Sequence, residues 1–316
     1  EETACGGAFG HSRVKKRVWY KALAPSVKRE AIATMVIEHQ LSERHACELV
    51  GLSRDAYRNP ARPSELNTTL STRIIEIAHT RRRAGYRMMH DLLRPEHPGI
   101  NHKRIYRLYS EAGLAVRRKV KAKRYGERVP LIAAETVNQT WSLDFVSDSL
   151  SNGRRLKALT LADDFTHECV QMAVDFGIGA SYVARLLDEA AQFRGYPQAV
   201  RTDNGPEFIA KAFLAWTQSH HIKHILIQPG CPTQNAYIES FHGTFRDECL
   251  NEHWLTSRAE ARAESTRWRR DYNEVRPHSS IGRIPPAKFA AQHRQLTADA
   301  AREASSTTHR TPETIS

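Results

Sequence analysis

The sequence predicts an α/β protein in which a mixed sheet with helices on both faces is preceded by helical modules. Apolar residues recur at helical spacing up to about Val129. The stretch QTWSLDFVSD then alternates apolar and polar side chains, as a half-buried strand does, and two more strand-like runs follow it. Further along, short apolar runs alternate with amphipathic helical patterns, which is typical of a sheet covered by helices.

Length, charge and cysteine content narrow the class of protein. The 316 residues are enough for two domains, and 40% hydrophobic and 26% charged residues are an ordinary globular composition. A net charge of +12 suggests a polyanionic partner. Five cysteines without a CxxC pair argue against a disulfide framework and a zinc site. Their odd, scattered placement leads us to expect a cytosolic protein with reduced thiols. No apolar run approaches the length of a membrane span, and the first residues lack the apolar core of a secretion signal.

The first region, residues 1–64, is expected to be helical. LSERHACELVGLSRDAYRN has the pattern of a helix, a turn and a second helix, with Ser42 as an N-cap and Gly51 in the turn. This pattern fits a DNA-binding helix-turn-helix or a plain helical hairpin. In the first case Arg54 and Arg58 on the second helix would contact DNA.

The second region, residues 65–128, is expected to hold two helical patterns joined by the loop PEHPG. The patterns are TRIIEIAHTRRRAGYRMMHDLLR and NHKRIYRLYSEAGLAVRRK, and together they form another helix-turn-helix candidate. A basic strip follows, which would be a solvated linker or a surface that binds DNA phosphates. Its candidate DNA contacts are Arg117, Arg118, Lys119 and Lys121.

The third region, residues 129–255, carries the predicted sheet. Strands are expected at QTWSLDFVSD, LKALTLADD, HECVQMAVDF, QAVRT and IKHILI. Helices are expected at SYVARLLDEAAQFRG, at EFIAKAFLAWTQSHH as one continuous helix, and from about Asn235. The last region, residues 256–316, is expected to be a charged helix followed by a disordered tail.

Three carboxylates lie where metal chemistry could use them. Asp144 is on the first strand, Asp203 follows the fourth, and Glu239 is on the helix after the fifth. Clustered carboxylates repel one another unless a cation is present, and oxygen ligands suit Mg²⁺ or Mn²⁺. Two such ions, about 3.5–4 Å apart, serve in-line displacement at phosphorus. Asp163 and Asp164 end a strand near the same edge, either as turn and supporting residues or as direct ligands.

The helix of Glu239 shows two stripes. One is polar and consists of Asn235, Glu239, His242 and Arg246. The other is apolar and consists of Ile238, Phe241, Phe245 and Cys249. Packing of the apolar stripe on the sheet would direct the polar stripe along its edge, where Arg246 could hold a phosphate. Asn235 and Asn204 are further candidate DNA contacts beside it. The alternative is a solvated helix face.

Several motifs in the same order resemble a known family. WSLDFV, RTDNGPEF and QPGCPTQNAYIESFHGTFRDECLN are similar to the catalytic core of DDE transposases of the IS3 insertion-sequence family, which resemble retroviral integrases. RHACELVGLSR, GYRMMHDLLR and NHKRIYRLYSEAGL resemble the helical region before that core, and DYNEVRPHSSIGRIPPAKF resembles the segment after it.

The resemblance implies an RNase H-like five-stranded core with Asp144, Asp203 and Glu239 as its metal-binding catalytic triad. It places Arg246 where the family has a Lys or Arg, and Asn204 in the family's Asp-Asn-Gly motif. His242 stands where an Asn is common, so no catalytic role is expected for it.

The activity implied by the resemblance is DNA transposition. One strand would be cleaved at each end of an insertion sequence, and the freed 3′ hydroxyl would be joined to a second strand, with Mg²⁺ or Mn²⁺ as cofactor. The expected partners are double-stranded DNA (terminal inverted repeats and target), further copies of the chain in a homodimer or higher oligomer, and an upstream-frame helix-turn-helix and leucine-zipper protein. We expect a bacterial, nucleoid-associated protein. The alternatives are a catalytically inactive DNA-binding regulator and a metal-dependent nuclease that only hydrolyses.

Overall fold

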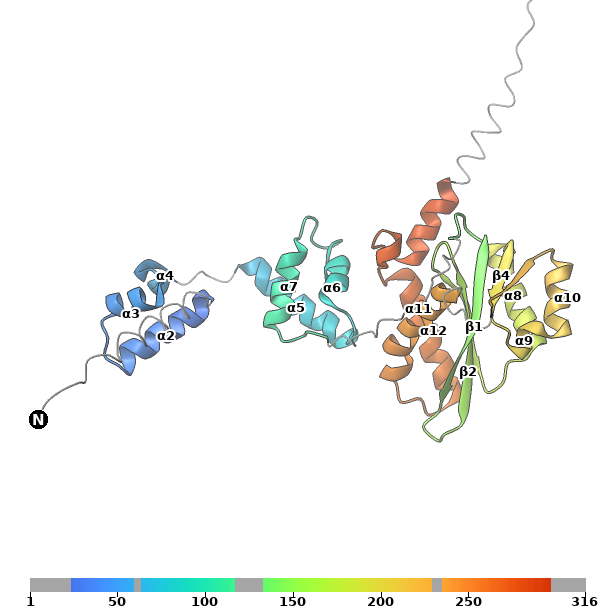
Figure 1. Ribbon diagram of the computed structural model, residues 1–316, viewed down its shortest axis with the longest axis horizontal. Coiled ribbons are helices and arrows are strands. Elements are labelled where there is room, and N and C mark those ends of the chain that lie inside the picture. The colour runs from blue at the N-terminus through green and yellow to red at the C-terminus, as the bar shows by residue number, and fades with distance from the viewer. Residues whose placement is uncertain (1–23, 60–63, 117–132, 229–234, 297–316) are drawn as a thin grey trace, which may run out of the picture. The chain divides into compact units, whose positions relative to one another are not determined.

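The structure is a computed structural model that describes residues 24–59, 64–116, 133–228 and 235–296 (Figure 1). The chain forms two compact units, residues 1–69 and 70–316. The basic strip, with Arg117, Arg118, Lys119 and Lys121, lies outside the described residues. In the part that is described, no helix is both long and apolar enough to cross a membrane.

The first unit contains three short helices, α2 (Pro25–Ile37), α3 (Glu43–Val50) and α4 (Arg54–Arg58). Ser42 caps α3 by accepting a hydrogen bond from the His45 amide, and Ser53 caps α4 in the same way. Gly51 ends α3 with a φ of +71°, a conformation that glycine adopts without strain. A small core holds the helices together and consists of Ile32, Ala46, Cys47 and Val50. Use of this unit as a DNA-binding helix-turn-helix stays a prediction.

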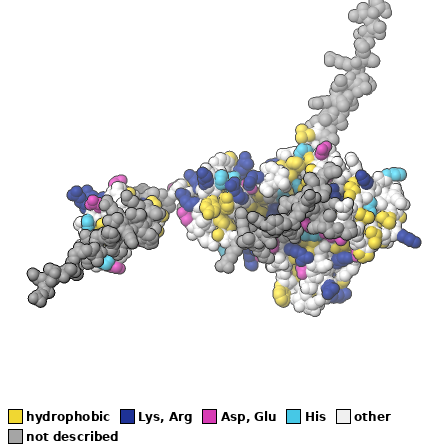
Figure 2. Space-filling view, in the orientation of Figure 1, with side chains coloured by type: hydrophobic (Ala, Val, Ile, Leu, Met, Phe, Trp, Pro, Cys, Tyr) yellow, Lys and Arg dark blue, Asp and Glu magenta, His cyan; other side chains and the backbone are white. Residues whose placement is uncertain are grey.

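A second helical module consists of α5 (Glu65–Thr80), α6 (Tyr86–Leu93) and α7 (His102–Glu111). Its core includes Leu70, Ile74, Met89, Leu93, Ile105 and Leu108. The single helical pattern expected before the PEHPG loop is wrong, because the chain leaves α5 at Thr80 and re-enters a helix after Gly85, whose backbone is extended. Figure 2 shows Lys and Arg side chains gathered over this module on the face in view.

The rest of the second unit is built on a five-stranded sheet. Its strands are β1 (Thr140–Ser149), β2 (Arg155–Asp163), β3 (Cys169–Asp175), β4 (Ala199–Thr202) and β5 (Lys223–Leu226). The spatial order is β3-β2-β1-β4-β5, with antiparallel pairing of β1 with β2 and of β2 with β3, and parallel pairing of β1 with β4 and of β4 with β5. This is the predicted RNase H-like mixed sheet.

Helices cover both faces of the sheet, as predicted (Figure 1). One face packs against α8 (Ala180–Arg194), α9 (Pro206–Ile209) and α10 (Lys211–Ser219). The other packs against α11 (Ala236–Glu248) and α12 (Arg258–Glu274). The alternation in β1 sorts its side chains as expected, with Trp141 and Leu143 in the first core and Val146 in the second.

One predicted helix of the core is wrong. EFIAKAFLAWTQSHH forms two helices, because Ala210 between α9 and α10 has an extended backbone with ψ 147°. Phe208 and Phe213 are both fully buried in the same core. They are five residues apart, and positions five apart do not share a face of one continuous helix. The break lets both rings reach the sheet.

The helix α12 shares a core with the sheet. Ala261, Trp268 and Tyr272 pack with residues of β1, β2, β3 and α11. The Asn273 side chain also bonds both backbone groups of Cys169 on β3. Two short 3-10 helices flank α12, η2 (Leu250–Glu252) and η3 (Ser279–Ile281). The domain limits given above stay a prediction, and these contacts favour grouping α12 with the core.

Candidate active site

The sheet places Asp144 and Asp203 on neighbouring strands. In the parallel pair of β1 and β4, Ser142 is opposite Arg201, and two residues further along each chain come the two aspartates. Asp144 is half-buried in β1, where its Oδ1 accepts a 2.6 Å hydrogen bond from the Phe145 amide. Asp203 lies just beyond the carboxyl end of β4. Strand register therefore brings together two carboxylates separated by 58 residues.

The turn after β4 holds the Asp203 carboxylate. The Gly205 amide donates a 3.0 Å hydrogen bond to Asp203 Oδ1. A Cβ atom at Gly205 would lie only 2.9 Å from the same oxygen, so the Asp203 carboxylate can keep this position only beside a glycine. Pro206 begins α9 directly afterwards. Asn204 is exposed, with its Nδ2 3.5 Å from the Ile227 carbonyl oxygen.

The third carboxylate comes from α11. The predicted apolar stripe is confirmed, because Ile238, Phe241, Phe245 and Cys249 are all buried against the sheet. Glu239 lies in the first turn of the helix and is exposed. Packing of the apolar stripe therefore leaves this carboxylate accessible beside the sheet.

His242 is the residue that sequence reasoning missed. It lies three residues after Glu239, and its Nε2 is 2.7 Å from the hydroxyl oxygen of Thr160 on β2. Its Nδ1 is 3.6 Å from Oδ2 of Asp144, which is a contact too long for a hydrogen bond. The alternation of β2 together with the (i, i+3) spacing from Glu239 was a signal that the histidine faces the same site.

The electrostatics of Asp144 link the three carboxylates. Burial raises the pKa of Asp144 to about 6, the Phe145 amide opposes that rise, and the negative charges of Asp203 and Glu239 add to it. Burial, helped by the charge of Arg246, lowers the pKa of His242 to about 4, so this ring is neutral at pH 7. Asp144 therefore has no cationic histidine beside it.

The donor chemistry of the site fits a hard divalent cation. All three side chains offer carboxylate oxygens, and their mutual repulsion is the kind that a cation relieves. Within the described ranges, no three His, Cys, Asp or Glu side chains approach closely enough to hold one ion between them. The three carboxylates are thus close enough to repel but not close enough to form a metal cage.

The polar stripe of α11 behaves differently at its two ends. Arg246 is exposed in the last turn and donates a 3.1 Å hydrogen bond to the Ser147 carbonyl of β1. Asn235, just before the helix, is only 2% exposed, and its Oδ1 has no hydrogen-bond partner among the residues that the structure describes. The prediction that Asn235 contacts DNA is therefore wrong, because a buried side chain cannot reach a phosphate.

Asp163 and Asp164 are engaged in the framework of the fold. Asp163 accepts hydrogen bonds from the amides of Asn138, Phe165 and Thr166. Asp164 is buried, bonds Ser142 and forms an ion pair with Arg201. These contacts favour the supporting role over direct binding of a metal.

The first unit presents its two candidate arginines to solvent. Arg54 and Arg58 are both exposed on α4. Arg58 forms a bidentate ion pair with Glu43, with Nε 2.9 Å from Oε1. Such exposed pairs are weak, so a DNA phosphate could compete for this arginine.

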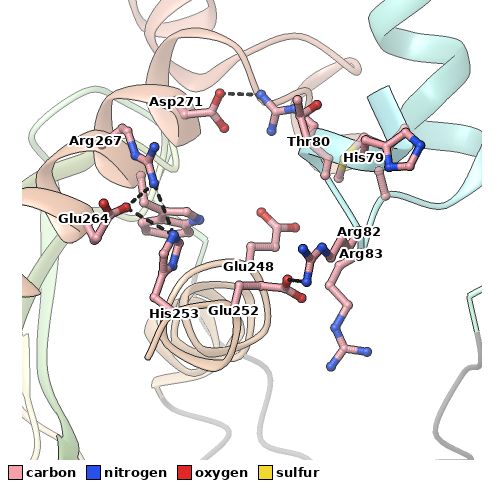
Figure 3. A pocket seen from close by; sticks show the side chains of 14 residues that line it. His79, Thr80, Arg82, Arg83, Glu248, Glu252, His253, Glu264, Arg267 and Asp271 are labelled. Atoms are coloured by element: carbon pink, nitrogen blue, oxygen red, sulfur yellow. Dashed lines mark hydrogen bonds and ion pairs between the residues drawn. The ribbon is translucent and has the colours of Figure 1, made fainter. Parts of the chain in front are cut away.

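A cavity of about 350 Å³ lies apart from the three carboxylates (Figure 3). It is lined by the turn between α5 and α6 and by residues of α11, η2 and α12. Arg81 pairs with Asp271, Arg82 lies 3.7 Å from Glu252, and Glu248 is held by Arg276 outside the lining. Because each acidic side chain in its lining is paired with an arginine, the cavity offers no net charge for a ligand.

Comparisons with known proteins agree with this architecture. Residues 134–232 and 220–286 each match the family described as integrase core domain, and residues 65–122 match the HTH-like domain. In the solved structure of the HTLV-2 integrase catalytic core with magnesium, 16% of aligned residues are identical, with a TM-score of 0.41 over 49% of this chain and 97% of that one.

Three relatives are proteins of bacterial insertion elements. The 39.2 kDa protein of IS476 from Xanthomonas euvesicatoria is 62% identical over 93% of this chain and 85% of its own length. The 31.7 kDa protein of IS407 from Burkholderia multivorans is 57% identical over 82% of this chain and 94% of its own length. The putative transposase InsK of IS150 from Escherichia coli is 26% identical over 70% of this chain and 82% of its own length. With an integrase core, an HTH-like domain and these relatives, the chain belongs to the DDE transposases of insertion sequences.

Proposed function

We propose that this DNA transposase cleaves and joins DNA strands at Asp144, Asp203 and Glu239, with Mg²⁺ or Mn²⁺ as cofactor and two ions per site. The observation that carries the proposal is the convergence of three carboxylates: the register of β1 with β4 places Asp144 and Asp203 on neighbouring strands, and the charges of both Asp203 and Glu239 act on Asp144. A site that is destabilised by its own negative charges is suited to a cation. When bound, the ions would stabilise charge on the attacking and leaving oxygens of a phosphodiester.

The protein's own contribution is to hold the carboxylates in place. A backbone amide engages Oδ1 of Asp144, and another engages Oδ1 of Asp203. In each case the second oxygen is left for a cation. Glu239 approaches from α11, whose position is fixed by its buried apolar stripe. Rigid strands and a packed helix reduce the reorganisation needed when substrate binds.

The DNA contacts that we propose are basic or polar and face solvent. Arg246 would hold a phosphate next to the carboxylates, and Asn204 would contact DNA from the turn after β4. Arg54 and Arg58 of the first unit would add backbone contacts, as would the basic strip at residues 117–121. Two element ends must meet in one reaction, so we propose at least a dimer on DNA, and an upstream-frame partner that adds end recognition. The relatives come from bacteria, and we propose action in the cytoplasm on nucleoid DNA.

The test is a strand-transfer assay with DNA that carries the ends of the insertion element. The full chain is incubated with Mg²⁺, and binding, cleavage and joining are measured separately. We expect Asp203→Asn to bind DNA normally and to lose both cleavage and joining. The matched control is Asp148→Asn on β1, outside the proposed triad.

Three results would contradict the proposal. Substantial joining by Asp203→Asn would remove this residue from the catalytic role. Cleavage without joining by the unmodified chain would indicate a nuclease that only hydrolyses. DNA binding without either reaction would indicate a regulator.

A further inference from the structure

Two buried threonines lie directly behind the two proposed metal-binding aspartates. Thr160 is opposite Asp144 in the pairing of β1 with β2, and its hydroxyl oxygen is 3.0 Å from the Asp144 carbonyl oxygen. Thr202 directly precedes Asp203, and its hydroxyl oxygen is 2.9 Å from the Asp203 carbonyl oxygen. Neither threonine has any solvent exposure. The same contact is therefore made at both aspartates.

Each threonine also contacts a histidine from another element. Thr160 Oγ1 lies 2.7 Å from Nε2 of His242 on α11. Thr202 Oγ1 lies 2.8 Å from Nε2 of His224 on β5. The first contact joins the helix of Glu239 to the backbone of Asp144. The second joins the edge strand β5 to the turn that holds Asp203.

The chemistry of these groups fixes the direction of both hydrogen-bond chains. A carbonyl only accepts, so each threonine hydroxyl donates its one proton to the aspartate carbonyl. The histidine nitrogen beside it must then carry a hydrogen and donate to the threonine oxygen. A neutral imidazole has one N–H, and in both rings the contact with the threonine places that hydrogen on Nε2. The chains run from Nε2–H through the hydroxyl to the carbonyl, and every donor is used once.

These hydrogen bonds to the backbone also orient the carboxylates. At Asp144, the peptide unit whose carbonyl accepts from Thr160 also contains the Phe145 amide, which donates to Asp144 Oδ1. Fixing that peptide plane therefore fixes the donor that orients the carboxylate. At Asp203, the held carbonyl lies in the turn whose Gly205 amide donates to Asp203 Oδ1. Hydrogen bonds buried away from water are stronger than exposed ones.

We propose that Thr160 with His242, and Thr202 with His224, are two positioning pairs that fix the backbone at Asp144 and Asp203 and so orient two of the carboxylates that would hold the cation. The proposal rests on the proposed function, because it assigns a purpose to residues that surround the same aspartates. The His242 ring acts through Nε2 and Thr160, rather than through the 3.6 Å contact between its Nδ1 and the Asp144 carboxylate.

The first test measures Mn²⁺ binding to the full chain, from the electron paramagnetic resonance signal of free Mn²⁺, without any reaction. We expect Thr160→Val to lower the affinity about tenfold, at the lower end of the effects known for residues that orient metal ligands. Thr160→Ser keeps the hydroxyl and should bind like the unmodified chain. The same pair of substitutions at Thr202 should behave in the same way. Thr217→Val is the matched control, since that buried hydroxyl donates to Leu214 in α10, away from both aspartates.

Two substitutions of His242 separate the two nitrogens of the ring. The amide of His242→Gln can occupy the place of Nε2, so this variant should retain Mn²⁺ affinity. The amide of His242→Asn can occupy only the place of Nδ1, so this variant should bind as weakly as Thr160→Val. The opposite order, with Asn retaining affinity and Gln losing it, would overturn the proposal in favour of direct action on the carboxylate.

The second test needs no metal and is amide hydrogen exchange of peptides covering residues 140–149 and 199–205. Thr160→Val should speed exchange in the first peptide, Thr202→Val in the second, and Thr217→Val in neither. Unchanged exchange together with unchanged Mn²⁺ affinity would overturn the proposal. The proposed function fails if the unmodified chain binds no Mn²⁺, or if its Mn²⁺ binding is unchanged by Asp144→Asn. In that case the hydrogen-exchange data still decide whether the two pairs fix the backbone at the two aspartates.

Discussion

Asp144 should make the metal-free protein less stable at neutral pH than it is with an uncharged side chain at this position. Its pKa is about 6 in the folded protein, against an ordinary value of 3.8, and its side chain is only 25% exposed. The folded state therefore binds the proton more tightly than the unfolded state. Stability attributable to this group is complete below about pH 3.8 and is lost as the pH rises through 6.

The magnitude follows from the difference between the two pKa values. Each pH unit between them is worth about 1.4 kcal/mol, so ionisation of Asp144 costs the fold up to about 3 kcal/mol. Partial exposure and relaxation of the site reduce this, and we expect about 1 to 3 kcal/mol. Asp144→Asn keeps an acceptor for the Phe145 amide and removes the charge. This variant should be more stable than the unmodified chain at pH 8 and equally stable at pH 4.

The assay is urea-induced unfolding with a chelator present, followed by tryptophan fluorescence at pH 4, 6 and 8. Asp148→Asn is a close control, because Asp148 lies on the same strand and accepts a hydrogen bond from the next amide, as Asp144 does. Added Mg²⁺ should stabilise the unmodified chain and leave Asp144→Asn unaffected. Equal stability of Asp144→Asn and the unmodified chain at pH 8 would refute the account of Asp144 as a buried, repelled carboxylate. So would a variant that is stabilised more at pH 4 than at pH 8.

Three further predictions concern the turn, the framework and the DNA contacts. Gly205→Ala should reduce strand transfer by at least tenfold, because its Cβ would displace the Asp203 oxygen, whose hydrogen bond to the backbone is worth about 1.5–3 kcal/mol. The control is Gly179→Ala at an open helix start, which should transfer normally; equal activity of the two variants would contradict this prediction. Asp164→Ala should lower the free energy of unfolding by about 3–5 kcal/mol, because it leaves the Arg201 charge buried and unpaired, and a loss below 1 kcal/mol in chemical denaturation would count against that role. Neutralising the basic strip should flatten the dependence of DNA affinity on salt, measured by fluorescence anisotropy; the residues to change are Arg117, Arg118, Lys119 and Lys121. An unchanged slope would indicate that the strip is only a solvated linker.

Local features of the sequence were sufficient for most elements of the fold. Alternation in β1 and the apolar stripe of α11 assigned side chains to the correct faces, because side-chain direction repeats every two residues in a strand and about every 3.6 in a helix. The two helix breaks were missed, at Ala210 and after Thr80. Helical composition continued across both, and the five-residue interval between Phe208 and Phe213 was the only local sign of the first break.

The sequence by itself determined which carboxylates to consider and on which elements they lie. It left open whether Asp163 and Asp164 bind the metal or support the fold, and the structure engages both in the framework. It also left His242 without a role and Asn235 exposed. These outcomes depend on the register of β1 with β4 and on the packing of α11, which bring Asp144, Asp203 and Glu239 together across 58 and 35 intervening residues. Only tertiary structure could decide them, because burial, and with it the pKa of an acid or the neutrality of a histidine, is set by neighbours that are distant in the chain.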